Sequence, residues 1–172
     1  MEGVERYKVR LIPHNPEWTD EYEKVKDKLL ELWNSNILDI QHVGSTAIKS
    51  ICAKPILDVA VKLNSIKDMD IEVLQKYGYS YCGVQHGNYN YHLFVLRGDN
   101  QISLRHIHCY DKSENEFEML VGFRDYLNLH CDKALQYENI KKELALKYPD
   151  DRIAYTAGKE DFIRSIYEQL NK

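Results

Sequence analysis

The chain has 172 residues, of which 44% are hydrophobic and 29% charged, and its formal net charge at pH 7 is -4. A chain of this length is typical of one domain with a sizeable core. The acidic balance argues against an obligate nucleic-acid-binding protein, because such proteins usually carry a basic excess. It does not argue against a nucleotide as ligand, since a nucleotide needs only a local basic pocket.

The cysteines and the first residues indicate the cellular compartment. Cys52, Cys82, Cys109 and Cys131 are widely spaced and form no C-x-x-C pair. The segment MEGVERYKVR has no apolar stretch of the kind found in signal peptides, and no apolar run reaches the roughly 18 residues of a membrane span. We therefore expect a cytoplasmic protein with reduced thiols and no membrane association. For Cys109, a buried strand cysteine is favoured over a thiolate nucleophile.

Apolar periodicity predicts strands and helices in alternation over the first two thirds of the chain. Gly78 is the expected C-terminal cap of the second helix, and GDNQ at 98–101 is typical of a hairpin turn. The expected elements are, in order, a strand over 7–12, a helix over 17–34, strands over 37–43 and 55–62, a short helix over 66–77, and strands over 89–97 and 102–110.

From about residue 114 the pattern becomes helical. Three apolar stripes are expected to face the core, and Asp150 or Asp151 is expected to cap the last helical segment. The sequence therefore predicts an α+β fold, with a mixed sheet and flanking helices in residues 1–112 and a helical lobe in residues 113–172 of the same domain. The three stripes are Phe117, Leu120, Val121, Arg124 and Leu127; Leu135, Ile140 and Leu144; and Ala154, Tyr155, Phe162, Ile166 and Leu170.

The strand at 37–43 runs directly into Gly44 and Ser45, which form the first candidate for a ligand site. Gly44 lets the backbone turn sharply and lets a ligand approach the main chain. Ser45 offers a hydroxyl, and the amides that follow it suit an anion such as phosphate. A Walker A loop is excluded, because Ile48 or Lys49 stands where the second glycine of GxxxxGK[ST] belongs. A turn glycine without chemistry is the alternative reading.

Asp58 lies in the otherwise apolar strand that follows. A Gly-Ser pair after one strand and a carboxylate on the next are typical of polymerase-beta-type nucleotidyltransferases, in which strand acids hold magnesium and the serine holds phosphates. The usual form has two acids at i and i+2, which share one face of a strand. Here the second position is Ala60, so two-metal catalysis is not expected. An ion pair with Lys54 is the purely structural alternative for Asp58.

HVGSTAIKSICAKPILDVAV at 42–61, together with RHIHCY, FRDYLNLH and KYPDDRIAYTAGKEDFI further along, resembles the GrpB family over nearly the whole chain. The resemblance implies a nucleotidyltransferase-superfamily fold. It also implies that the family's pattern falls on His42, Gly44, Ser45, Thr46, Lys54, Pro55, Asp58, His106, His108, Arg124, Asp125, Tyr126, Tyr155, Lys159 and Phe162.

Pattern and resemblance together make Asp58 the expected catalytic residue and magnesium ligand. We expect Gly44, Ser45, Asp58 and at least one of Arg124 and Lys159 to line one cleft between the sheet and the helical lobe. The residues expected to contact a nucleotide or other phosphate-bearing ligand are His42, Gly44, Ser45, Thr46, Lys54, Arg124 and Lys159.

Three functions remain open at this point. The first is a nucleotidyl or phosphoryl transferase, and the second is a nucleotide-binding module without catalysis, which Ala60 favours. The third is a zinc-dependent hydrolase. It would use His106 and His108, which share one strand face, with His92 from the expected hairpin partner. Hydrogen-bonded structural histidines are the alternative to a zinc site.

Overall fold

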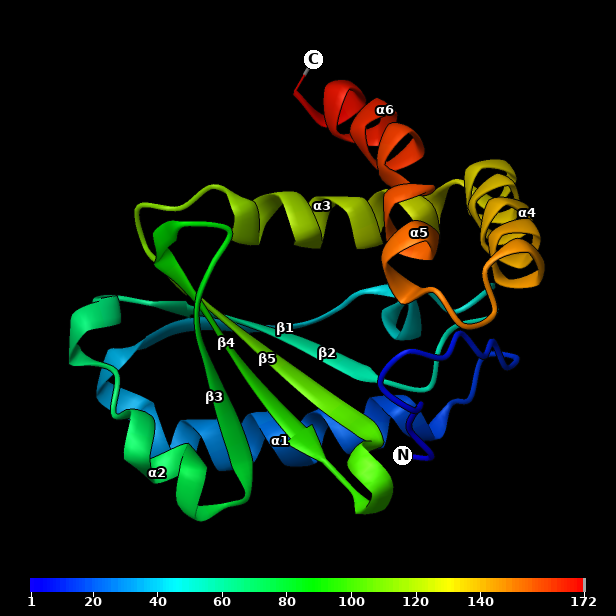
Figure 1. Cartoon of the computed structure of the whole chain (residues 1–172). Helices are drawn as coiled ribbons and strands as arrows, with labels where there is room; N and C mark the ends of the chain where they lie inside the picture. The colour runs from blue at the N-terminus through cyan, green and yellow to red at the C-terminus, as the bar shows by residue number, and fades with distance from the viewer. Residues whose placement is uncertain (172) are drawn as a thin grey trace.

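The structure, a computed structural model, describes residues 1–171. Its centre is a five-stranded mixed sheet in the order β1-β2-β5-β4-β3 (Figure 1). β2 and β5 are parallel, and the other neighbouring strands are antiparallel. The strands are β1 Ile37–Val43, β2 Leu57–Leu63, β3 Tyr79–Gln85, β4 Asn88–Arg97 and β5 Ser103–Asp111.

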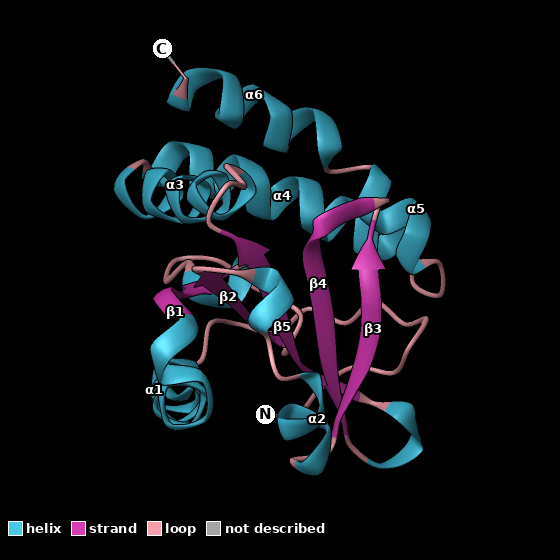
Figure 2. Ribbon diagram, turned by 90° about the vertical axis from the view of Figure 1, so that its left-hand side faces the viewer, coloured by secondary structure: helices cyan, strands magenta, loops and turns pink. Residues whose placement is uncertain are grey.

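Helices cover both faces of the sheet. α1 and α2 lie against one face, and α3, α4, α5 and α6 lie over the other (Figures 1 and 2). The helices are α1 Glu17–Trp33, α2 Ile71–Lys76, α3 Glu116–Leu129, α4 Cys131–Lys147, α5 Arg152–Ala157 and α6 Glu160–Leu170. Short 3-10 turns occupy Asn34–Asn36, Ser45–Ala47, Ile66–Asp68 and Asp99–Gln101.

The main core lies between α1 and the sheet. Because side chains alternate along a strand, β2 sends Leu57, Val59, Val61 and Leu63 to this face, and all four are fully buried. Trp18, Tyr22, Val25 and Leu29 form the buried stripe of α1, at the helical spacing expected from the sequence. This face of the sheet is called the α1 face below.

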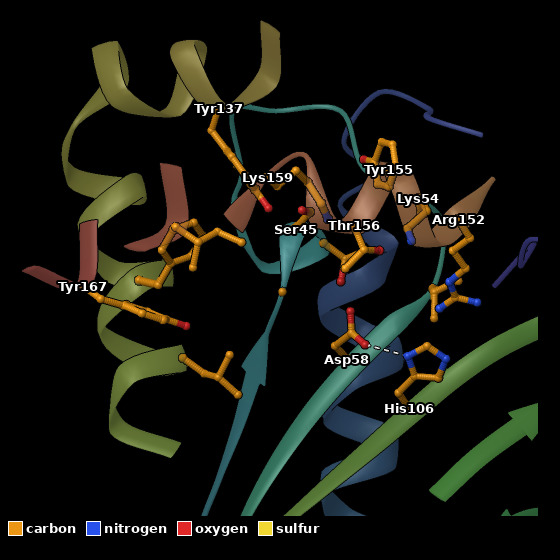
Figure 3. A pocket seen from close by; sticks show the side chains of 16 residues that line it. Ser45, Lys54, Asp58, His106, Tyr137, Arg152, Tyr155, Thr156, Lys159 and Tyr167 are labelled. Carbon is orange, nitrogen blue, oxygen red and sulfur yellow. Dashed lines mark hydrogen bonds and ion pairs between the residues drawn. The ribbon is translucent and has the colours of Figure 1, made fainter. Parts of the chain in front are cut away.

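The other face of the sheet carries Asp58, His106 and His108, whereas Arg105 of β5 faces α1. Asp58 and Ala60 alternate with the apolar core residues of β2. Asp58 points toward the lobe formed by α3 to α6 (Figure 3), and Ala60 packs against Phe117 of α3 in the same direction. Two smaller apolar clusters hold this lobe together. One joins α3, α4 and α6 to the loop after β1, and the other joins α3 to β2, β4 and β5. This is called the lobe face below.

The α+β fold class is confirmed, with helices flanking a mixed sheet and a C-terminal group of helices on one face. The expected strand at 7–12 is wrong. Apart from a turn from Lys8 to Glu5, that segment makes one backbone hydrogen bond from Val9 to Pro149 and an isolated bridge between Ile12 and Ala53, and within residues 1–171 it pairs with no strand of the sheet. The hairpin at 98–101 and the cap at Asp151, which accepts from the amides of Ile153 and Ala154, are confirmed.

Four further differences concern local structure. β3 was not expected from the sequence. The helix expected at 66–77 is a 3-10 turn followed by the shorter α2, and Gly78 follows α2 with a φ of +84°. The third expected apolar stripe, from Ala154 to Leu170, is divided between the two helices α5 and α6. The face of α4 that is buried carries Ala134, Tyr137, Glu138 and Lys141 rather than Leu135, which is 56% exposed. Among residues 1–171, no helix is long and apolar enough to cross a membrane.

Candidate functional site

The loop after β1 places Gly44 against Asp58. β1 and β2 pair so that Val43 lies opposite Asp58, and Gly44 follows with a φ of +70°. A Cβ atom at Gly44 would lie 2.6 Å from Oδ2 of Asp58. Glycine is therefore required twice, for its left-handed backbone and for the close approach of the carboxylate.

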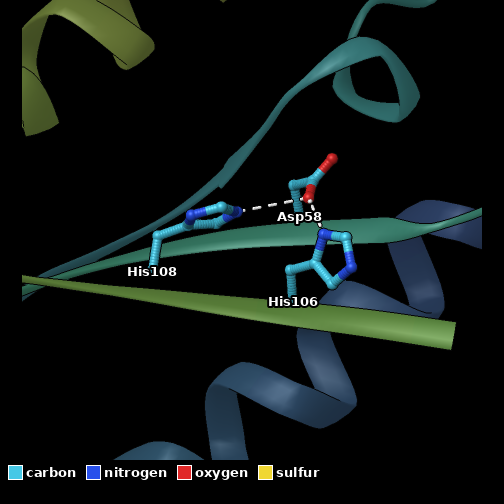
Figure 4. A group of neighbouring side chains, drawn as sticks. All are labelled: Asp58, His106 and His108. Atoms are coloured by element: carbon cyan, nitrogen blue, oxygen red, sulfur yellow. Dashed lines mark hydrogen bonds and ion pairs between the residues drawn. The ribbon is translucent and has the colours of Figure 1, made fainter. Parts of the chain in front are cut away.

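Two histidines face the same carboxylate oxygen from the neighbouring strand (Figure 4). In the parallel register of β2 and β5, Asp58 lies opposite His106 and Ala60 lies opposite His108. Oδ1 of Asp58 is 2.9 Å from Nδ1 of His106 and 3.2 Å from Nε2 of His108. In the described structure Oδ2 makes no side-chain hydrogen bond, and the Asp58 side chain is 27% exposed. The second oxygen is thus open to the cleft.

The surroundings keep this aspartate ionised. Burial alone would raise the pKa of Asp58, but the hydrogen bonds from His106 and His108 outweigh it and hold that pKa below its usual range. Burial lowers the pKa of His106, against the attraction of Asp58. At neutral pH the geometry therefore pairs a carboxylate with an imidazole that is neutral.

The cleft above Asp58 is a cavity of about 270 Å³ between the sheet and the lobe (Figure 3). Three cationic side chains line it: Lys54 from the segment before β2, Arg152 from α5, and Lys159, which begins α6. The ring of Tyr155 lies between the two lysines, with its centroid 5.1 Å from Nζ of Lys54 and 4.6 Å from Nζ of Lys159. This buried ring holds both ammonium groups at the cleft by cation-π contact.

The three cations in the cleft lack partners among the described residues. No carboxylate lies within ion-pair distance of Lys54, Arg152 or Lys159, and their side chains donate no hydrogen bond to residues 1–171. Burial lowers the pKa of Lys54 to about 7, and the nearby charges of Arg152 and Lys159 contribute to this lowering. Burial also lowers the pKa of Lys159 to about 8, although Asp58 opposes this. An anion in the cleft would stabilise the charged form of both lysines.

Most of the residues expected at one site lie together in the cleft. Its lining includes seven of them: Gly44, Ser45, Thr46, Lys54, Asp58, His106 and Lys159. His108 touches Asp58 from the side, and its Nδ1 is 2.7 Å from the hydroxyl of Tyr91. The ion pair considered for Lys54 and Asp58 is not formed.

His42 and Arg124 lie outside the cleft. His42 stacks on Tyr22 of α1 and is hydrogen-bonded to Thr46, and burial lowers its pKa to about 4. Arg124 donates to the backbone oxygen of His42 and to Gln41, so it joins α3 to β1. Both residues support the loop that presents Ser45, and neither reaches the space above Asp58.

Sequence reasoning missed Arg152 and Thr156 as lining residues. They are four residues apart, and Arg152, Tyr155, Thr156 and Lys159 follow the 3-4 spacing of one helical face. The basic residues on that face were the available signal. Tyr137 and Tyr167 also line the cleft, but nothing in their sequence positions distinguishes them from the other eleven tyrosines.

Three side chains have the composition of a divalent metal site. The nearest ligand atoms of Asp58, His106 and His108 all lie within 4.8 Å of one another. His92 does not join them, because it lies opposite Cys109 and therefore on the α1 face of the sheet, whereas His106 and His108 lie on the lobe face. Its Nδ1 is 2.7 Å from the hydroxyl of Tyr81. Ala60 stands where a second acid would be expected and is fully buried among Val43, Tyr91, Tyr110 and Phe117.

Comparison with known proteins identifies the family of this chain. The family model described as GrpB protein matches residues 8–169. Glutamate-rich protein GrpB of Alkalihalophilus pseudofirmus is 33% identical over 99% of this chain and 100% of its own length. The crystal structure of conserved protein GrpB from Enterococcus faecalis is 27% identical, with a TM-score of 0.84 over 93% of this chain and 96% of that one.

The fold extends beyond these relatives. The Cid1 poly(U) polymerase, in a crystal structure with Mg and 3'-dATP bound, is 13% identical to this chain, with a TM-score of 0.52 over 86% of this chain and 49% of that one. That likeness shows a shared nucleotidyltransferase-like fold. The chain belongs to the GrpB family.

Proposed function

We propose that the cleft above Asp58 binds a phosphate-bearing small molecule, with a nucleotide as the favoured ligand. The observation that carries this proposal is the set of unpartnered cations Lys54, Arg152 and Lys159 around one cavity in the described part of the chain. Burying such charges without partners is unfavourable, and phosphate oxygens would supply the missing partners. The Ser45 hydroxyl at the same cavity suits the same ligand.

Asp58 fits a magnesium ion only in one arrangement. Mg²⁺ prefers oxygen ligands and commonly binds through one or two carboxylates and the phosphates of a substrate. Oδ2 of Asp58 faces the cleft, so it could hold an ion that the ligand's phosphates hold from the other side. Bound there, magnesium would neutralise phosphate charge. His106 and His108 stand beside Asp58 where oxygen ligands would suit magnesium better.

Nucleotidyl or phosphoryl transfer is the less supported part of the proposal. A two-ion arrangement needs a second carboxylate beside Asp58, and Ala60 and the two histidines occupy the neighbouring positions. We therefore propose ligand binding with slow or absent transfer of ordinary nucleotides. A binding module without catalysis accounts for the same residues.

Thermal shift measurements with ATP, with and without MgCl₂, test the proposal. A ligand that binds only the native state raises the melting temperature by mass action. We expect a shift with ATP that is larger with magnesium, that is lost in Lys159→Met, and whose magnesium-dependent part is lost in Asp58→Asn. Lys142→Met is the control, because Lys142 lies on α4 away from the cleft and is half exposed. Equal shifts in wild type and Lys159→Met would refute the assignment.

Proton uptake provides an independent readout. Lys54 and Lys159, with pKa values of about 7 and about 8, are partly neutral near pH 8, and a bound phosphate would raise both values. We expect ATP binding at pH 8 to take up protons, seen as a dependence of the calorimetric enthalpy on the ionisation enthalpy of the buffer. Binding without proton uptake would place the phosphates away from these lysines.

A second candidate is a transition-metal centre, and the Asp58, His106 and His108 cluster favours it. Imidazole nitrogen suits zinc and related ions, and catalytic zinc sites use three protein ligands and keep one position open. The distances of 2.9 and 3.2 Å from Oδ1 to the two nitrogens are near those between neighbouring ligands of one such ion. Elemental analysis of the purified protein tests this. We would expect stoichiometric metal in the wild type and its loss in His108→Gln.

A further inference from the structure

A second cavity of about 490 Å³ adjoins the first. His106, Arg152 and Thr156 line both cavities, so the two spaces meet at these side chains. The second cavity lies over β4 and β5, and residues of β3, α5, α6 and the N-terminal segment line its other sides.

Three arginines line this second cavity: Arg6, Arg97 and Arg152. In the described part of the chain, none of their side chains forms an ion pair or donates a hydrogen bond. Arg6 only stacks over the ring of Tyr7. Burial lowers the pKa of Arg152, and the charge of Arg97 contributes to this lowering. The attraction of Asp58 opposes this lowering, but among residues 1–171 no carboxylate lies within ion-pair distance of either arginine.

Arg97 is the clearest sign of a missing partner. Its Nε is buried and has no hydrogen-bond partner among residues 1–171. Arg105 on the next strand also has a buried Nε without a partner there, but its Nη2 donates to Glu21 at 2.7 Å. Arg97 has no such carboxylate. A guanidinium with free donors suits an oxyanion with two acceptor oxygens.

The remaining wall of the cavity is largely apolar. Leu93 and Val95 line the floor, and Tyr7 and Ile153 line the rim. Ile153 is 82% exposed and Tyr7 is 64% exposed, so an apolar surface lies open beside the arginines. Glu160 is the carboxylate in this lining, and it forms no ion pair with the three arginines within residues 1–171.

We propose that the second cavity binds a second small molecule that carries a phosphate or carboxylate group next to an apolar part. Its anionic group would lie between Arg97 and Arg152, and its apolar part against Val95 and Ile153. The proposal rests on the proposed function only in assuming that the first cavity holds a different, phosphate-bearing ligand. Arg152 at the junction would contact both ligands.

Binding of phenyl phosphate in the presence of saturating inorganic triphosphate tests this. Triphosphate fills the first cavity, and phenyl phosphate carries both features expected of the second ligand. We expect phenyl phosphate to raise the melting temperature further, and Arg97→Met to weaken its binding about tenfold or more. Benzoate in place of phenyl phosphate tells a carboxylate site from one that requires phosphate. Arg164→Met is the control, because Arg164 is exposed on α6 and pairs with Asp161.

The outcomes separate the two proposals. If Arg97→Met binds phenyl phosphate like the wild type, or if triphosphate excludes phenyl phosphate, the second site is refuted. A different result would refute the proposed function alone. In that case triphosphate does not raise the melting temperature of the wild type or of Lys159→Met, whereas phenyl phosphate does so for the wild type and much less for Arg97→Met. Should Arg97→Met fail to fold, Arg6→Met probes the same cavity from an exposed position, and its failure to weaken phenyl phosphate binding would also refute the site.

Discussion

The two faces of the sheet differ in what their charged side chains find as partners. On the α1 face, Arg105 donates to Glu21, and the lysines of α1 pair with glutamates three residues away. The buried His42 on that face is hydrogen-bonded to Thr46. On the lobe face, the cations of the two adjoining cavities have no such partners among residues 1–171. Those cations are the half-buried Lys54, Arg97, Arg152 and Lys159 and the exposed Arg6.

This difference shows which side of the sheet is complete without a ligand. A paired charge on the α1 face contributes to a stable fold and needs nothing further. An unpaired buried charge is unfavourable for the isolated protein, so its retention is more easily explained by binding than by stability. The chain has a net charge of -4, and yet it gathers cations at one place, which strengthens the contrast.

Ala60→Asp is expected to have the largest effect, because it places a charge in the dry part of the lobe face. Ala60 is fully buried among Val43, Tyr91, Tyr110 and Phe117. We expect the free energy of unfolding to fall by about 3–5 kcal/mol at pH 7.5, as for other uncompensated buried charges. Urea denaturation measures it. Asn is nearly equal to Asp in shape, so Ala60→Asn should lower the free energy of unfolding less than Ala60→Asp. The difference in stability between the two variants should decrease as the pH falls. A stable Ala60→Asp variant would show that the cleft extends to this position.

The α1 face should make the protein sensitive to acid through His42. Its pKa in the folded protein is about 4, below the ordinary value of 6.5, so the unfolded chain binds the proton more readily. Stability from this group is complete above pH 6.5 and is lost as the pH falls toward 4, by about 3 kcal/mol. Urea denaturation across this pH range should show that the free energy of unfolding falls less steeply with decreasing pH in His42→Gln than in the wild type. The exposed His130→Gln should keep the slope of the wild type.

Gly44→Ala tests the close contact that begins the cleft. Gly44 and Gly83 have similar φ values, +70° and +75°, but of the two only Gly44 has a neighbour within 4 Å of the point where a Cβ atom would lie. We expect Gly83→Ala to cost about 1 kcal/mol from backbone strain and Gly44→Ala to cost about 2–3 kcal/mol. Urea denaturation of both variants isolates the clash with Asp58. Equal losses would mean that the carboxylate moves aside freely.

Replacing the cleft lysines should stabilise the protein without ligand. Lys159→Met and Lys54→Met each remove a half-buried ammonium group that has no ion-pair partner among residues 1–171, and each keeps an apolar chain of similar length. We expect the free energy of unfolding to rise by about 1–2 kcal/mol at pH 7. Lys24→Met on α1 is the control, because Lys24 is exposed and pairs with Glu21, and it should change stability by less than about 0.5 kcal/mol. If either cleft-lysine variant has a lower free energy of unfolding than the wild type, the proposed difference between the two faces of the sheet is wrong.

The sequence predicts the parts of this protein that depend on local pattern. β1 has the predicted limits, α1 differs by one residue, and the Gly44 loop follows β1 as expected. β3 escaped prediction because its residue types do not follow its alternating burial: Gly83 and Gln85 occupy less exposed positions, and Val84 is exposed. The segment 7–12 alternates, but alternation cannot show whether a partner strand edge is free.

The site was predictable only in part, for a topological reason. Gly44, Ser45 and Asp58 are near in sequence, and their arrangement follows from one turn. The contact of Asp58 with His106 depends on the parallel pairing of β2 and β5, which one sequence does not reveal. Arg124 was expected at the cleft from the family resemblance and from its charge, but its position on α3 turns it toward the backbone oxygen of His42.

The parallel pairing of β2 with β5 also sets when the site can exist during synthesis. Asp58 can contact His106 only after forty-eight more residues have been synthesised. The cations on α5 and at the start of α6 are synthesised later still. Chains emerge from the ribosome N-terminal end first, and parallel pairings between distant segments form slowly. A growing chain can therefore complete α1 and its core before any ligand can bind. A ligand in the cell would therefore stabilise the folded protein. It could not assist folding before α5 and α6 have been synthesised.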